Sequence, residues 1–148
     1  MSRTKKTIFF FLLAIFLISA AGCKDNNSDV NNYGLEEFIA ELKAKNYDFT
    51  LKEVGKNFLP TTRKRISIGD EAIDVYVFKN NKGMEKEAAK IEPSGFGYQS
   101  KTKAVKVSWI SVPHFYKKGR IIVQYIGENE KIIADLKEIL GPQFAGLN

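Results

Sequence analysis

The chain has 148 residues and a formal net charge of +6, but three of its 23 basic residues and none of its 17 acidic residues precede Cys23. The part from Cys23 onward therefore carries a mild excess of three positive charges, without the clustered basic stripe of a nucleic-acid-binding protein. A single cysteine and a single histidine exclude an intrachain disulfide and any metal site built from several such side chains.

The first 22 residues have the three-part layout of a secretory signal peptide. A basic segment, residues 3–6, precedes eleven apolar residues, 8–18, and the small residues 19–22 lead to Cys23. Eleven apolar residues are too few for a transmembrane helix, which needs about 20. We therefore predict that residues 1–22 are a signal peptide and not a permanent membrane span.

The end of this segment resembles the lipobox of bacterial lipoproteins, although Ala20 stands where leucine is commoner. In that family a diacylglyceryl group is attached to the cysteine, the signal is cleaved just before it, and the new amino group is often acylated as well. The resemblance implies that acyl chains such as palmitate on Cys23 anchor the protein to the extracytoplasmic side of a cell membrane.

Residues 23–32 are expected to be the lipidated cysteine and a flexible tether, because residues 24–32 contain a single apolar side chain, that of Val30. Fully extended, these nine residues reach at most about 30 Å, so the folded part should stay near the membrane. Residues 33–148 are enough for one domain of ordinary size and too few for two.

The sequence of this domain alternates between helical and strand patterns. Apolar residues at helical spacing predict helices over residues 35–46, 84–91 and 129–140. Alternation with a period of two predicts strands over residues 47–52, 66–68, 73–77, 105–109 and 121–126. Turns at residues 69–71 and 117–119 each indicate a β-hairpin.

The apolar positions of the first hairpin and its following helix recur 48 residues later. Val75 corresponds to Val123 in this way, and Ala88 corresponds to Leu136. This constant offset suggests a pair of ββα units. We therefore expect an α+β fold of two layers, with an antiparallel sheet of about five or six strands and helices mainly on one face.

The opposite face of this sheet yields a candidate contact surface. If the helices after the hairpins cover the face that carries Val75, the other face presents a mixture of aromatic and polar groups. These are Asp74, Tyr76, Phe78 and Gln124. The more usual alternative is that the amino-terminal helix or residues 55–62 pack over this face, which would leave no such surface.

The sequence offers little sign of catalytic chemistry. His114 would have to serve any Ser-His-Asp site, but no motif of a nucleophilic serine turn accompanies it. Gly95 and Gly97 lack the third glycine and the helix start of a phosphate-binding loop. The alternating context of Trp109 favours a core position. We expect no catalytic, cofactor-binding or metal-ligating residues and no cofactor.

A second resemblance lies mainly in the carboxy-terminal half. Residues 113–127 (PHFYKKGRIIVQYIG) and 140–146 (LGPQFAG) resemble a recurrent domain of small secreted or lipid-anchored bacterial proteins. Residues 75–78 fit the same pattern, so that the likeness spans about residues 35–146. That family has no assigned activity. The resemblance implies a cell-envelope location and a shared fold, and it supplies no catalytic residues.

These observations predict a non-enzymatic binding or accessory module, anchored to the membrane by its lipid and contacting an envelope protein or polymer but no nucleic acid. One alternative is an envelope hydrolase that uses His114 with a carboxylate. Another is an inhibitor or accessory subunit of a membrane complex. Convergence of Asp74, His114 and a serine in one pocket would favour the hydrolase.

Overall fold

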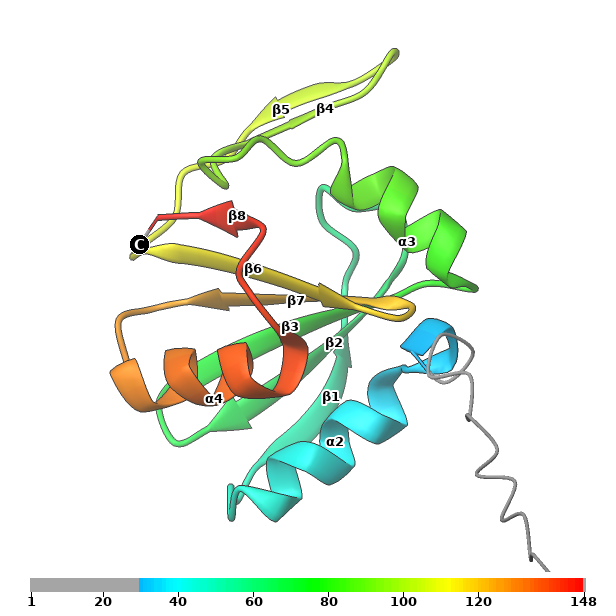
Figure 1. The fold of residues 1–148 in the computed structure, drawn as a ribbon. Coiled ribbons are helices and arrows are strands. Elements are labelled where there is room, and N and C mark those ends of the chain that lie inside the picture. The colour runs from blue at the N-terminus through cyan, green and yellow to red at the C-terminus, as the bar shows by residue number, and fades with distance from the viewer. Residues whose placement is uncertain (1–29, 148) are drawn as a thin grey trace, which may run out of the picture.

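A six-stranded antiparallel sheet organises residues 30–147, the part of the chain that the computed structural model describes (Figure 1). In order across the sheet, its strands are β1 (Thr50–Val54), β2 (Thr62–Ile68), β3 (Glu71–Val77), β7 (Ile121–Ile126), β6 (Pro113–Lys118) and β8 (Ala145–Gly146). Strands β4 (Gly97–Gln99) and β5 (Ala104–Lys106) form a separate pair. The predicted α+β class is confirmed. The predicted signal peptide, Cys23 and most of the tether lie outside the described residues.

Both predicted hairpins are present, β2–β3 and β6–β7. Their turns contain Gly69 with φ +57° and Gly119 with φ +56°, a left-handed conformation that glycine adopts without steric cost. Strands β3 and β7 pair with each other, and Val75 lies opposite Val123. The pairing is symmetric about these two residues, so a two-fold rotation that exchanges Val75 with Val123 also exchanges β3 with β7. The 48-residue offset in the sequence therefore corresponds to an approximate two-fold relation between the hairpins.

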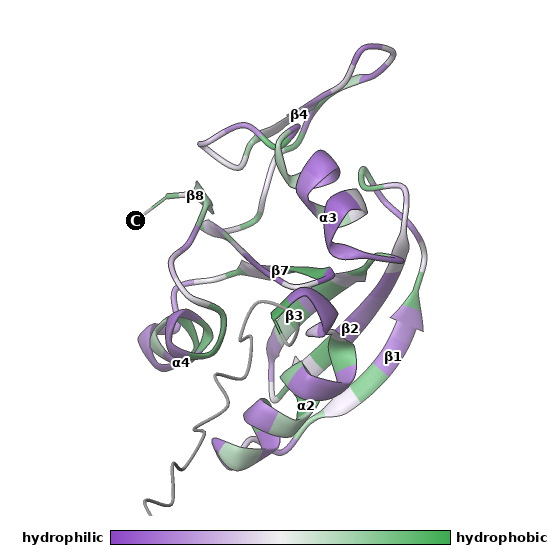
Figure 2. Cartoon of the chain, turned by 45° about the vertical axis from the view of Figure 1, so that its right-hand side comes forward, coloured by the Kyte–Doolittle hydropathy of each residue, from purple (hydrophilic) through white to green (hydrophobic). Residues whose placement is uncertain are grey.

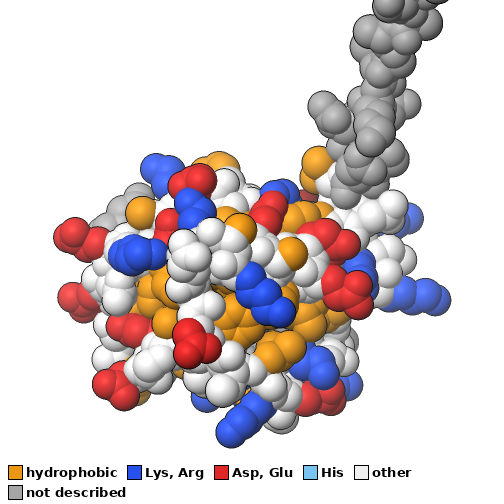
Figure 3. Space-filling model, turned by 90° about the horizontal axis from the view of Figure 1, so that it is seen from below, with side chains coloured by type: hydrophobic (Ala, Val, Ile, Leu, Met, Phe, Trp, Pro, Cys, Tyr) orange, Lys and Arg blue, Asp and Glu red, His pale blue; other side chains and the backbone are white. Residues whose placement is uncertain are grey.

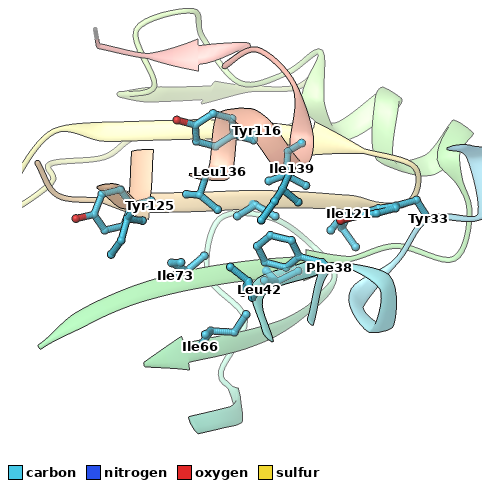
Figure 4. Packing of buried hydrophobic residues seen from close by; sticks show 14 residues of the cluster. Tyr33, Phe38, Leu42, Ile66, Ile73, Tyr116, Ile121, Tyr125, Leu136 and Ile139 are labelled. Atoms are coloured by element: carbon cyan, nitrogen blue, oxygen red, sulfur yellow. The ribbon is translucent and has the colours of Figure 1, made fainter. Parts of the chain in front are cut away.

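Two helices cover one face of the sheet. Helices α2 (Leu35–Ala44) and α4 (Glu130–Leu140) lie on the same side of it in Figure 1. Figure 4 shows side chains of both helices pointing into one core above the strands. The labelled members include Phe38 and Leu42 of α2, Leu136 and Ile139 of α4, and Ile66 and Ile73 of the sheet. Seen from this side, apolar side chains remain visible among charged ones (Figure 3).

Helix α3 (Asn81–Ala88) lies on the opposite face, where Met84 belongs to the same buried cluster as Tyr76. The expectation that both hairpin-following helices cover the same face is therefore wrong. Phe78 accounts for the difference, because it is buried on this second face and its N–H donates to the carbonyl of Arg120. The residue 48 positions later, Ile126, is only half-buried. Burial of Phe78 thus directs the chain across the second face after β3.

The second face is covered by more than α3. Phe58 and Leu59, in the segment before β2, pack there, and the ring of Phe58 contacts Tyr76 and Tyr98 at centroid distances of 6.0 and 5.8 Å. Figure 2 shows apolar residues concentrated in β3 and β7 and hydrophilic residues over α3. The alternative in which residues 55–62 pack on this face is confirmed.

The prediction that this face is an exposed contact surface is therefore wrong. Tyr76 is 0% exposed and Phe78 is 7% exposed, and Asp74 and Gln124 are also buried. Strand β3 carries Val75 on one face and Tyr76 on the other, and both faces must be covered, since exposing either side chain would forfeit the free energy of apolar burial. Among residues 30–147, no helix is long and apolar enough to span a bilayer.

We predict that Tyr76→Ala and Leu136→Ala destabilise the protein to a similar extent, because each removes a fully packed side chain from one of the two cores. The expected losses in free energy of unfolding are about 3 to 5 and about 2 to 5 kcal/mol. Leu51→Ala on edge strand β1, where Leu51 is 43% exposed, should change it by less than about 0.5 kcal/mol. Urea melts of the three variants measure this, and a Tyr76→Ala effect as small as that of Leu51→Ala would show an open second face.

Candidate functional site

A cavity of about 300 Å³ lies on the second face, at the end of the sheet where β2 and β3 are joined. Its floor carries Arg63 and Arg65 of β2, Asp74 of β3 and Gln124 of β7, and residues 108–110 form a wall. The strand period of two places these four side chains on one face. The register then brings them together, because Asp74 lies opposite both Arg65 and Gln124.

Asp74 holds two guanidinium groups. Arg65 donates from Nε to Oδ1 at 2.7 Å and from a terminal nitrogen to Oδ2 at 2.9 Å, a bidentate geometry. Arg63 donates to Oδ2 at 3.2 Å. The Asp74 and Arg63 side chains are largely buried, whereas 42% of the Arg65 side chain is exposed. Two positive charges thus share one carboxylate, which leaves one positive charge uncompensated within this cluster.

A chain of hydrogen bonds continues from this cluster along the floor. Asn57 donates to the Tyr76 hydroxyl at 2.8 Å, and that hydroxyl donates to Gln124 Oε1 at 2.7 Å. Burial raises the pKa of Tyr76 to about 12, and the hydrogen bond from Asn57 opposes part of that rise. Tyr76 therefore remains a neutral donor at physiological pH and fixes the orientation of the Gln124 amide.

Two buried donors on the floor have no acceptor in the described part of the chain. They are Nε of Arg63 and Nε2 of Gln124, and each nitrogen exposes less than 1 Å² of its own surface. Buried donors are nearly always paired, because an unpaired one forfeits its hydrogen bond to water. Both donors belong to residues that line the cavity, so the floor is deficient in hydrogen-bond acceptors.

Trp109 and Ile110 make the wall opposite the charged floor largely apolar, with Ser108 as its polar member. The indole of Trp109, half-buried, donates to the carbonyl of Gly95 at 2.8 Å, and its ring lies 6.2 Å from that of Phe115. Ile110, the next residue, is 100% exposed at the mouth of the cavity. Trp109 thus packs against the aromatic core, as predicted, but it is only partly buried and it also lines the cavity.

The structure separates the four residues of the predicted contact surface. Asp74 and Gln124 lie together in the cavity floor, and the Tyr76 hydroxyl reaches Gln124 from the core. Phe78 belongs to the aromatic core and does not line the cavity. The predicted contact surface did not include Arg63 and Arg65. The available signal was their spacing, since arginines two apart on one strand can both face an aspartate on the next.

His114 does not join this site. It pairs across the strands with Tyr125 and stacks on that ring at 5.9 Å, on the α4 face, whereas Asp74 lies on the other face. Its ring nitrogens contact Gln143 Oε1 at 2.7 Å and the carbonyl of Gly127 at 3.1 Å. Within residues 30–147, no serine or carboxylate hydrogen-bonds to His114. Asp74, His114 and a serine therefore do not converge.

Two further observations bear on the chemistry of the chain. In the described part, no group of three or more His, Cys, Asp and Glu side chains is arranged to hold a metal ion. Comparisons with models of protein families, with curated proteins and with solved structures find no match.

We predict that Asp74→Asn destabilises the fold by roughly 3 kcal/mol, the low end for removing one partner of a buried ion pair, because Arg65 reaches solvent. The substitution leaves two guanidinium groups close together without a carboxylate. Glu53→Gln, which removes the partner of Lys64 in an exposed pair, is the control and should leave stability nearly unchanged. Urea melts of both variants test this, and equal effects would contradict the importance of the buried cluster.

We also predict that Tyr76 makes stability decrease in alkaline solution. Its pKa is about 12 in the folded protein and near 10 when unfolded, so its contribution is complete below pH 10 and is lost between pH 10 and 12. The added slope should approach about 1.4 kcal/mol per pH unit. Urea melts at several pH values should show a shallower decline for Tyr76→Phe than for the unsubstituted protein. Parallel declines would contradict the assignment.

Proposed function

We propose that this protein is a non-enzymatic binding or accessory module, anchored by lipid on Cys23 to the extracytoplasmic side of a cell membrane, and that it holds its ligand in the Arg63–Asp74–Arg65 cavity. The observation that carries the binding function is the cavity floor, where a shared carboxylate and two unpaired donors face an apolar wall. Most of the residues that line the cavity are polar or charged, and together with the apolar side chains of Trp109, Ile110 and Ile126 they can orient a small ligand.

The position of the cavity supports a role at a membrane surface. The described chain begins beside the β6–β7 turn, where the N–H of Arg120 donates to the carbonyl of Tyr33 at 2.8 Å and the Lys118 ammonium lies 4.1 Å from the centre of the Tyr33 ring. Residues 24–29, between the proposed anchor and this point, span at most about 20 Å. The β6–β7 turn should therefore face the bilayer.

The cavity lies at the other end of the same strands. It is lined by the β2–β3 turn and by Ile126 at the end of β7, whereas the β6–β7 turn precedes Ile121 at the start of β7. An anchored chain would thus open its cavity away from the membrane and toward the envelope. The hydrolase alternative has no support in the described residues, since His114 and Asp74 lie on opposite faces of the sheet.

We predict that the mature protein, extracted from its native membranes in mild detergent, carries a diacylglyceryl group on Cys23 and a small molecule that is released on denaturation. Mass spectrometry detects both. Cys23→Ser should abolish the lipid and prevent cleavage before residue 23. Arg65→Gln should reduce the amount of the small molecule, whereas Lys64→Gln, on the opposite face and paired with Glu53, should not.

Two results would contradict this proposal. The first is an unsubstituted protein recovered without lipid on Cys23. The second is an equal amount of the same small molecule bound to the unsubstituted protein and to Arg65→Gln.

A further inference from the structure

Resting on the proposed function, we infer that the ligand of this cavity is a small monocarboxylate with an apolar substituent. The first reason is the kind of hydrogen-bonding group that the floor lacks. Nε of Arg63 and Nε2 of Gln124 are donors without an acceptor, and guanidinium groups have no acceptor to offer. A ligand that completes this floor must bring acceptor oxygens.

The second reason is charge. Arg63 and Arg65 together carry two positive charges, and Asp74 supplies one negative charge in contact with both. Glu71 also lines the cavity, but its carboxylate accepts the Tyr125 hydroxyl at 2.8 Å, and Tyr125 belongs to the core on the opposite face. Asp70 is exposed in the β2–β3 turn, where solvent screens it. A ligand that brings one further negative charge therefore balances the charge of the buried cluster.

A carboxylate fits these requirements better than a phosphate does. It brings a single charge on two oxygens in one plane, which suits two unpaired donors and one uncompensated guanidinium charge. A dianion would carry a second charge that the floor does not neutralise, and removing that charge from water is costly.

The apolar wall defines the rest of the ligand. Trp109 and Ile126 line the cavity, and Ile110 is fully exposed at its mouth, where an apolar substituent would cover it. Burying methylene groups against this wall is favourable, so a short chain or ring adds affinity there. The volume of about 300 Å³ is at the lower end of the range for small-molecule sites, which favours a short substituent.

Arg65 is the first contact for such a ligand, since it is the more exposed of the two arginines. The unpaired nitrogens of Arg63 and Gln124 expose almost no surface, so they meet the carboxylate only after their side chains rotate, and for Gln124 this rotation disturbs the hydrogen bond from Tyr76. Binding therefore includes a local adjustment of the floor around Asp74, whose position is held by Arg65.

Trp109 is the only tryptophan in the chain, so its fluorescence reports on the cavity. The full chain in phosphatidylcholine nanodiscs is titrated at pH 8 with hexanoate, hexanamide and hexyl phosphate, which share the apolar tail and differ in the head. Empty nanodiscs correct for partition into the lipid. We expect saturable binding of hexanoate, with hexanamide and hexyl phosphate weaker by about tenfold or more, and weaker hexanoate binding at high salt.

Matched variants test the residues. Arg65→Gln should weaken hexanoate binding by about tenfold or more, because it removes a charge-assisted contact, and Lys64→Gln should leave it unchanged. Thermal melts show that each variant is folded. Equal or tighter binding of hexyl phosphate or hexanamide would overturn the carboxylate inference and leave a binding role intact. Absence of any hexanoate response would also overturn it, whereas the proposed function is judged separately by the lipid and the small molecule recovered from cells.

Discussion

The pairing of β3 with β7 about Val75 and Val123 is the constraint on which both cores of the protein depend. These two strands occupy the middle of the sheet and bury side chains on each of its faces. A strand that is apolar on both faces needs two covering layers. Helices α2 and α4 supply one layer, and α3 with the segment around Phe58 supplies the other.

The second layer is uneven along the strands, and this unevenness produces the candidate site. Near the β6–β7 turn the cover is aromatic and aliphatic, and it includes Phe78 and Met84. Toward the β2–β3 turn the strands carry Asp74 and Gln124 instead, and residues 108–110 form the wall above them. Buried polar groups need hydrogen-bond partners. Arg63 and Arg65 of β2 form ion pairs with Asp74, whereas one nitrogen of Arg63 and one of Gln124 remain unpaired. The same strands thus combine a stable core with a polar cavity.

Much of the fold could be predicted because periodicity is a local property. The hairpins around Gly69 and Gly119 and the long helix α4 follow from alternation, turn residues and helical spacing. Strand β8 could not be predicted, since its two residues pair through backbone groups that leave no side-chain pattern. The side of the sheet taken by α3 also escaped prediction, because it depends on how deeply Phe78 is buried compared with Ile126.

By itself, the sequence determined the α+β class, the hairpins and the set of side chains that share a strand face, because the alternation of a strand is independent of its neighbours. It also contains the segment whose resemblance to a signal peptide and lipobox is the basis of the proposed anchor. Only the tertiary structure decided that Asp74 meets two arginines, that Tyr76 is core and that His114 lies on the other face. Those outcomes depend on strand order, register and the covering layer, which bring together residues far apart in the chain.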